Sequence, residues 1–161
     1  MAYPSQRLAD LGLALPPVAA PLAAYVPAVR MGDLVFTSGQ LPSVTGELIA
    51  TGRVGAEVSV EQAVTCARAA ALNALAAVAD QAGELDAVTR IVKVVVYVAS
   101  APDFTGQAQV ANGASELFGA VLGEHGVHAR SAVGVAVLPL NAPVEVEVVA
   151  EVGSTPTIVP L

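Results

Sequence analysis

The residues 144–152 constrain the fold more tightly than any other stretch of the chain. Valines alternate there with glutamates: Val144, Val146, Val148 and Val152 against Glu145, Glu147 and Glu151. Successive side chains of a β-strand point to opposite faces of the sheet, so strict alternation predicts a strand with one buried face. The other face carries carboxylates. The chain therefore needs a sheet whose cover lies mainly on one side.

The remaining elements complete a mixed α+β domain. Apolar runs at 25–30 and 34–38 flank Gly32-Asp33, which predicts a hairpin. Ser59 and Gln62 form a capping box that begins a helix, and Gly83 is placed to end it. The remaining candidates are a helical turn at 5–13, strands at 88–99 and 131–138, and a glycine-weakened helix at 103–122. This order predicts helices that cover one sheet face.

Length and composition predict a single domain over residues 1–161 with an aliphatic core, since 55% of the residues are hydrophobic and only 4% are aromatic. We divide it into a Pro-rich N-terminal extension (1–22), a core (23–152) and a loose C-terminal tail (153–161). The uncharged stretch 11–29 contains four prolines, Pro16, Pro17, Pro21 and Pro27. Prolines at this density exclude a lipid-exposed helix, and the N-terminus fits a signal peptide poorly. We therefore expect a cytoplasmic protein.

The charge pattern argues against nucleic-acid and membrane partners. The net charge is -7, and the seven basic residues are scattered without a basic run. A mean hydropathy of +0.67 is high for a monomer and favours an oligomer. The single cysteine, Cys66, excludes an intramolecular disulfide framework and a multi-Cys zinc site, and its Ala-rich surroundings predict a buried thiol.

Few residues stand out as carriers of chemistry. No Gly-rich phosphate loop is present, so we expect no nucleotide cofactor. His125 and His128 lie near Glu124, but Gly126 separates them, and a solvated or capping role is favoured over a metal site. Arg130 stands alone between small residues, where it either grips a ligand carboxylate or pairs with a structural glutamate. Glu145 is either a solvated strand residue or, inside an oligomer, a partly buried acid–base group.

An ordered set of short motifs resembles the RidA/YjgF family of reactive enamine/imine deaminases, also called L-PSP endoribonucleases. The motifs span roughly residues 20–152 and are Tyr25, Thr37-Ser38-Gly39-Gln40-Leu41-Pro42, the strand 92–98, His128-Ala129-Arg130-Ser131, Leu138-Pro139 and Val144-Glu145-Val146-Glu147. Each motif is weak alone, but their order and spacing are specific.

The resemblance implies a chorismate-mutase-like fold with two helices on one sheet face, assembled as a homotrimer with sites between subunits. It further implies cofactor-free, metal-free hydrolysis of 2-aminoacrylate-type enamines and imines to 2-keto acids and ammonia. By this resemblance, Arg130 grips the substrate carboxylate and Glu145 positions or activates water. Tyr25, Ser38, Gly39 and Asn112 then contact the ligand.

Departures from the family pattern leave alternatives open. Ala132 stands where many members carry Cys, Ala24 stands where Pro is common, and the loop 52–55 is longer. These changes concern pocket shape and so substrate choice. One alternative is a trimer that binds a small carboxylate or metabolite without turnover. Another is an endoribonuclease or translation inhibitor, which the net charge of -7 disfavours.

Overall fold

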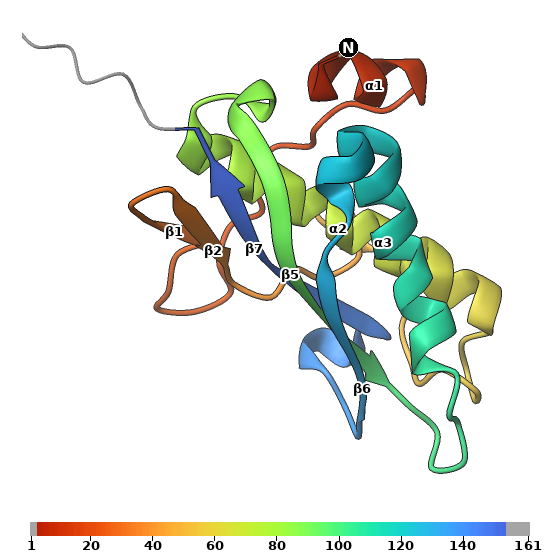
Figure 1. Ribbon diagram of the computed structural model, residues 1–161. Helices are drawn as coiled ribbons and strands as arrows, with labels where there is room; N and C mark the ends of the chain where they lie inside the picture. The colour runs from red at the N-terminus through yellow and green to blue at the C-terminus, as the bar shows by residue number, and fades with distance from the viewer. Residues whose placement is uncertain (1–2, 154–161) are drawn as a thin grey trace, which may run out of the picture.

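The computed structural model describes residues 3–153 and has an α+β architecture (Figure 1). Its principal elements are α1 (Pro4–Asp10), β1 (Ala28–Met31), β2 (Leu34–Thr37), α2 (Val60–Ala82), β5 (Val88–Ala99), α3 (Gln107–Leu122), β6 (Ala129–Val135) and β7 (Val144–Val152). Smaller elements are β3 (Ser43–Val44), β4 (Glu47–Leu48) and the 3-10 turns η1 (Leu85–Ala87), η2 (Gly123–Gly126) and η3 (Pro139–Asn141). The tail predicted at 153–161 lies outside the described residues except for Gly153.

The main sheet is mixed, with the strand order β1-β2-β7-β5-β6. Its pairs are antiparallel except for β5 and β6, which run parallel. A parallel pair needs a crossover connection, and α3 supplies it between β5 and β6. The predicted α+β domain is therefore confirmed, its sheet is mixed, and β6 lies at the edge of that sheet.

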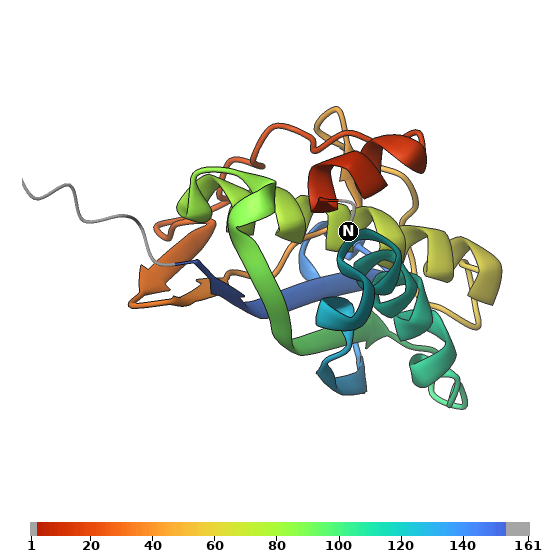
Figure 2. The ribbon, with the colours of Figure 1, turned by 45° about the horizontal axis from the view of Figure 1, so that its top comes forward.

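The long helices α2 and α3 lie together on one side of the sheet (Figure 2). The capping box that begins α2 is present: the Ser59 hydroxyl accepts from Gln62 N at 3.2 Å, and Ser59 N donates to Gln62 Oε1 at 3.0 Å. Gly113 allows the two helices to approach closely, because a Cβ there would lie 3.0 Å from the Val64 carbonyl carbon. Gly113, which lowers the helix propensity of this segment, is therefore needed for the close packing of α3 against α2.

The helix α2 is long and apolar enough to cross a membrane by length and composition alone. However, 67% of its apolar window is buried inside the domain. Its alanines pack against α3, β7 and β2. A core helix meets the same length and hydropathy criteria, so the feature does not indicate a membrane span.

Several predicted boundaries were wrong: the helical turn predicted at 5–13 ends at Asp10, and the strand predicted at 25–30 begins at Ala28. The second helix begins at Gln107 rather than 103, because Gly106 is its N-cap and the chain turns at Pro102. The strand predicted at 131–138 occupies Ala129–Val135 instead. It begins earlier because Ala129 already pairs with Lys93, and it ends earlier because the chain bends away toward η3.

The alternation in β7 is confirmed by burial. Its predicted core valines are at most 2% exposed, whereas Glu145 and Glu147 are half-buried on the opposite face. That opposite face has no helix over it (Figure 2) and carries exposed apolar side chains, namely Val29, Met31, Phe36 and Val133. Met31 is 76% exposed. A sheet face of this kind is suited to contact another protein surface.

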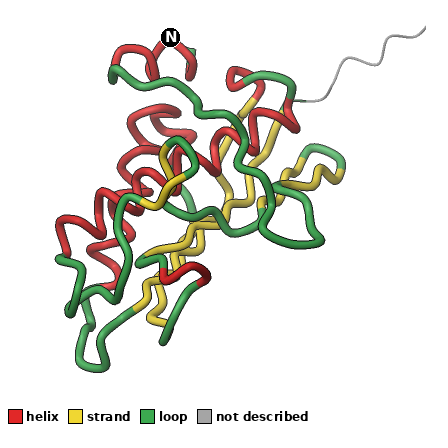
Figure 3. The backbone as a smooth tube through the Cα atoms, turned by 180° about the vertical axis from the view of Figure 1, so that it is seen from behind, coloured by secondary structure: helices red, strands yellow, loops and turns green. Residues whose placement is uncertain are grey.

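The N-terminal region packs onto the surface of the domain. Ser5 binds Asp86 through its backbone N (2.8 Å) and its hydroxyl (2.7 Å), and Leu8 is buried. Residues 11–27, here called the strap, then run along the molecule from α1 to the β1–β2 hairpin (Figure 3). The strap therefore lies across the helical side and reaches the start of the sheet.

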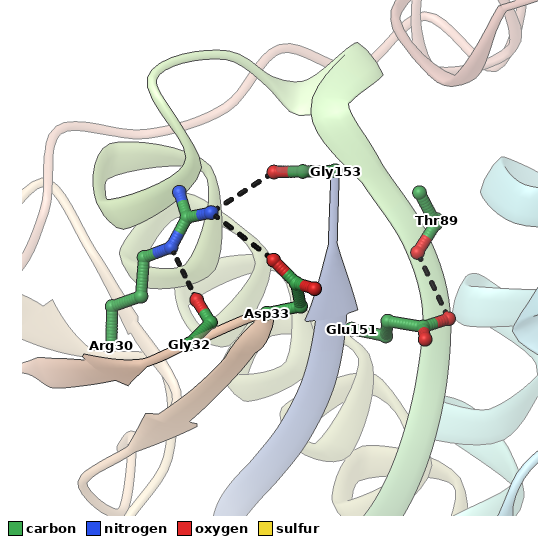
Figure 4. Close-up of polar contacts among 6 residues, drawn as sticks. All are labelled: Arg30, Gly32, Asp33, Thr89, Glu151 and Gly153. Atoms are coloured by element: carbon green, nitrogen blue, oxygen red, sulfur yellow. Dashed lines mark hydrogen bonds and ion pairs between the residues drawn. The ribbon is translucent and has the colours of Figure 1, made fainter. Parts of the chain in front are cut away.

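The β1–β2 turn is tied to the end of β7 (Figure 4). Arg30 Nη2 donates to the Gly153 carbonyl at 3.0 Å and lies 3.9 Å from Asp33 Oδ1, and its Nε donates to the Gly32 carbonyl at 2.9 Å. On the next strand pair, Thr89 donates to Glu151 Oε2 at 3.1 Å. These contacts fix the hairpin that leads into the 38–41 segment.

Candidate functional site

Arg130 lies on β6 and reaches toward α3. Its register partner on β5 is Val94, which is fully buried on the helix-covered face. The Arg130 guanidinium donates from Nη1 to Asn112 Oδ1 at 2.9 Å and to Ser115 Oγ at 3.1 Å, and from Nη2 to the Ala108 carbonyl at 3.2 Å. We call Asn112, Ser115 and Arg130 the arginine cluster.

The guanidinium of Arg130 is held by neutral acceptors only. Within residues 3–153, no carboxylate lies within 4.0 Å of its nitrogens, so the structural ion pair considered from the sequence is wrong. A guanidinium has five N–H groups in a planar fork. Three of them are engaged within the described residues, which leaves Nε–H and one Nη2–H without a partner there. These two N–H groups can donate to a carboxylate.

Ser115 joins Arg130 to His128, a connection that our sequence analysis missed. The His128 Nδ1 lies 2.6 Å from the Gly126 carbonyl, which can only accept, so Nδ1 carries a proton. In the neutral ring Nε2 then accepts from the Ser115 hydroxyl at 3.0 Å, while the Ser115 oxygen accepts from Arg130. This chain of hydrogen bonds, from Gly126 through His128 and Ser115, holds the Arg130 guanidinium in place. Ser115 follows Asn112 by three residues, the helical spacing that puts both on one face, and this signal could have found it.

Glu145 lies on β7, on the face that the helices leave open, and contacts Gly39. A Cβ on Gly39 would lie 2.6 Å from Glu145 Cδ, so the carboxylate occupies the space that glycine leaves free. Burial of this carboxylate raises the pKa of Glu145 above the ordinary carboxyl value, and the nearby charge of Glu147 raises it further. Both effects penalise the charged form, so the protonated form is favoured more than in water.

Tyr25 lies near the end of the strap, and Ser38 is hydrogen-bonded to strap residues. Ser38 N donates to the Pro27 carbonyl at 2.8 Å, and its hydroxyl donates to the Val26 carbonyl at 2.6 Å. The Tyr25 hydroxyl accepts from Leu22 N at 3.2 Å. Tyr25 and Gly39 both line a cavity of about 490 Å³ beneath the strap. We call Tyr25, Ser38, Gly39 and Glu145 the glutamate cluster.

The two clusters do not meet within one chain. Glu145 pairs with Tyr97 on β5, and Arg130 pairs with Val94, three residues away. Positions three apart on a strand point to opposite faces, so the two side chains leave the sheet on opposite sides. Strand spacing and rise per residue put their Cα atoms about 14 Å apart. A site that uses both needs Arg130 from one copy and Glu145 from another.

The other groups singled out from the sequence take no part in either cluster. Cys66 is 1% exposed, and burial raises the pKa of its thiol to about 11. His125 is exposed on η2. In the described part of the chain, no three His, Cys, Asp or Glu side chains gather where they could hold a metal ion.

The chain is similar in sequence to a known protein family. The family profile described as "YjgF/chorismate_mutase-like, putative endoribonuclease" matches residues 5–152. Protein TCP17 of Trypanosoma cruzi is 45% identical over 149 residues, which cover 92% of this chain and 93% of that protein.

Solved structures show the same fold. A crystal structure described as a putative endoribonuclease from Shewanella oneidensis has a TM-score of 0.90 at 34% identity, over 94% of this chain and 100% of that one. The crystal structure of E. coli TdcF with bound serine has a TM-score of 0.57 at 30% identity, over 85% of this chain and 93% of that one. The profile match and these identities together settle the family of the chain.

Proposed function

Because this chain belongs to the YjgF/chorismate-mutase-like family, we propose that it is a cofactor-free cytoplasmic deaminase. Its substrates are enamines and imines of the 2-aminoacrylate type, and its products are 2-keto acids and ammonia. The observation that carries this proposal is the state of Arg130, a half-buried guanidinium with neutral partners and two N–H groups that no described residue engages.

Arg130 binds the substrate carboxylate through these two N–H groups. Bidentate binding fixes the plane of the carboxylate and so the orientation of the neighbouring imine carbon. A relative with known structure supports the ligand class, since E. coli TdcF was crystallised with serine, which carries the same α-carboxylate. Asn112 and Ser115 both accept from Nη1 of Arg130 and do not compete for the two unengaged N–H groups.

Glu145 accepts and returns a proton during hydrolysis. Water adds to the electrophilic carbon of the protonated imine, and a carboxylate takes up the proton that this water loses. The carbon–nitrogen bond of the carbinolamine then breaks as nitrogen is protonated, ammonia leaves and the carbonyl forms. A carboxyl group with a raised pKa holds a proton more readily than an ordinary carboxyl group, which suits it to accept and return this proton. The sum is imine plus water giving keto acid plus ammonia, with no redox step.

The active unit is a homotrimer with one site at each subunit boundary. The arginine and glutamate clusters leave the sheet on opposite faces, so only a neighbouring copy can complete either of them. In a ring, one surface of each copy meets a different surface of the next, which pairs every Arg130 with a neighbour's Glu145. The apolar side chains on the open sheet face supply surface to bury in such a ring.

A coupled assay tests the proposal. An amino-acid oxidase or a dehydratase generates the imine in situ, semicarbazide competes for it, and release of keto acid is followed. Wild type should accelerate release, and Arg130→Ala should lower the rate about 30- to 1000-fold, equivalent to about 2–4 kcal/mol. Arg130→Lys keeps the charge without the fork and should recover only part of the rate. No acceleration by wild type with any imine would overturn the proposal.

Two alternative functions are tested with the same wild-type and Arg130→Ala proteins. Binding of a small carboxylate without turnover is favoured by Ala132, which stands where many relatives carry Cys, and would appear as keto-acid binding without hydrolysis. RNA cleavage is suggested by the descriptions of the family and of the Shewanella protein. The net charge of -7 argues against it. RNA cleavage that survives Arg130→Ala and follows the purified protein would reinstate it.

A further inference from the structure

The cavity beneath the strap is large for the substrate class proposed above. Its volume of about 490 Å³ falls within the range of small-molecule pockets. A 2-aminoacrylate-type imine carries only one carbon beyond the imine carbon and its carboxylate. Most of the cavity would stay unfilled around such a molecule.

The wall of the cavity is apolar and rigid. On one side the strap contributes Pro16, Pro17, Val18, Pro21 and Leu22. The ring of each proline fixes its backbone φ, so this wall loses little freedom when a ligand binds. No Asp, Glu, Lys or Arg is among the residues that line the cavity. The occupant is therefore uncharged and apolar where it meets the strap.

The floor of the cavity is held by Asn73 of α2, which is 5% exposed. Its amide nitrogen donates to the Leu41 carbonyl at 2.9 Å and to the Ser43 carbonyl at 3.0 Å. The buried amide of Gln40 likewise donates to the Ser38 carbonyl at 3.3 Å. Both amide nitrogens are engaged by backbone carbonyls, so the floor is formed before any ligand enters.

The cavity adjoins the reacting end of the glutamate cluster. Gly39 lines the cavity and at the same time contacts the Glu145 carboxylate, and Tyr25 lines it from the strap. Glu145 lies on the open face and the cavity on the helical side, so a molecule whose imine carbon lies near Glu145 extends its substituent around Gly39 to pass under the strap. In the proposed trimer the carboxylate end is bound by the neighbouring copy's Arg130.

Resting on the proposed function, we infer that this cavity binds the side chain of the substrate and that the strap selects 2-imino acids with a bulky, uncharged, apolar side chain. Leucine- and phenylalanine-derived imines represent this class. In a hydrophobic pocket, each additional methylene changes kcat/KM by about 10-fold or more. A leucine side chain has three more carbons than an alanine side chain. We therefore expect kcat/KM for the leucine-derived imine to exceed that for the alanine-derived imine at least about 10-fold.

The test compares that ratio in strap variants of the full chain. Ala20→Phe places a ring in the cavity from an exposed strap position that lines it, and Leu22→Trp does the same from a second position. Each should lower the leucine-to-alanine ratio about 10-fold or more. The matched control is Ala14→Phe, an exposed strap position outside the cavity lining. The glutamate-derived imine, whose side chain is charged, should be poor for every protein.

A second readout separates this inference from the proposed function. Calorimetric titration with 4-methyl-2-oxopentanoate and with pyruvate measures product binding without turnover. Hydrolysis with no preference for the larger imine, unaltered by Ala20→Phe and Leu22→Trp, would overturn the inference and leave the deaminase intact. Tighter binding of the larger keto acid, lost in both variants but with no hydrolysis of any imine, would support the cavity assignment and overturn the deaminase.

Discussion

Gly39→Ala tests whether the Glu145 carboxylate must lie where the structure places it. A Cβ at position 39 would lie 2.6 Å from Glu145 Cδ and closer still to Oε1, whereas ordinary contact begins at 3.4 Å, so the carboxyl group has to move by at least about 0.8 Å. Alanine is sterically permitted at this position, since Gly39 is not among the residues with positive φ. The side chain of Glu145 is flexible enough to move, so the cost falls on the position of the carboxylate and not on folding.

A displacement of about 1 Å in a catalytic group can cost about 100-fold in rate. We therefore expect Gly39→Ala to lower kcat for imine hydrolysis by about that factor while the midpoint of thermal unfolding changes little. The matched control is Gly119→Ala on α3, where an added Cβ meets nothing within 4 Å. Wild-type kcat in Gly39→Ala, measured in the semicarbazide-coupled assay, would refute the reasoning that Glu145 acts from beside Gly39.

Three other predictions concern packing and titration. Gly113→Ala should lower the free energy of unfolding by about 1–3 kcal/mol, since its Cβ would lie 3.0 Å from the Val64 carbonyl carbon. Gly119→Ala should instead raise it by up to about 1 kcal/mol. Urea titration compares them, and equal effects would contradict the close helix contact. The Cys66 thiol, with its pKa raised to about 11 by burial, should not react with Ellman's reagent at pH 8 until the protein is unfolded. Immediate labelling of native protein would contradict the burial of Cys66. The raised pKa of Glu145 means that the fold favours its protonated form, so stability is lost as pH rises through that pKa. Glu145→Gln should therefore unfold at a higher temperature than wild type at pH 7 and not at acid pH, and an advantage independent of pH would contradict this assignment.

The sequence predicted those parts of the fold that follow from local patterns. The capping box at Ser59 and Gln62 begins α2, and the alternation of Val and Glu sets the two faces of β7. Element ends were less predictable, because they depend on partners far along the chain. The strand β6 begins at Ala129 because Lys93 is there to pair with it, and no local signal near Ala129 reveals that partner.

The candidate site shows the same division. Motif resemblance picked out Arg130 and Asn112, and the structure brings them within 2.9 Å of each other. It also picked out Gly39 and Glu145, which are in contact. The separation of these two groups onto opposite faces depends on the register of β6 and β7 against β5, which a single sequence does not reveal. The same holds for the cavity, whose walls come from the strap, the 39–48 segment and α2.

The central claim is that Arg130 of one copy and Glu145 of another form one site, and mixing two inactive variants tests it most directly. Arg130→Ala and Glu145→Gln are co-expressed with different tags, doubly purified mixed oligomers are compared with each variant alone, and imine hydrolysis is measured. Each boundary takes Arg130 from one copy and Glu145 from the next. In a random mixture of the two variants, both residues are intact at about one quarter of the boundaries. We predict about a quarter of wild-type activity in an unselected mixture and about a third in the doubly purified trimers, because each trimer with both variants has one intact boundary of three. Activity no higher than that of either variant alone would contradict it.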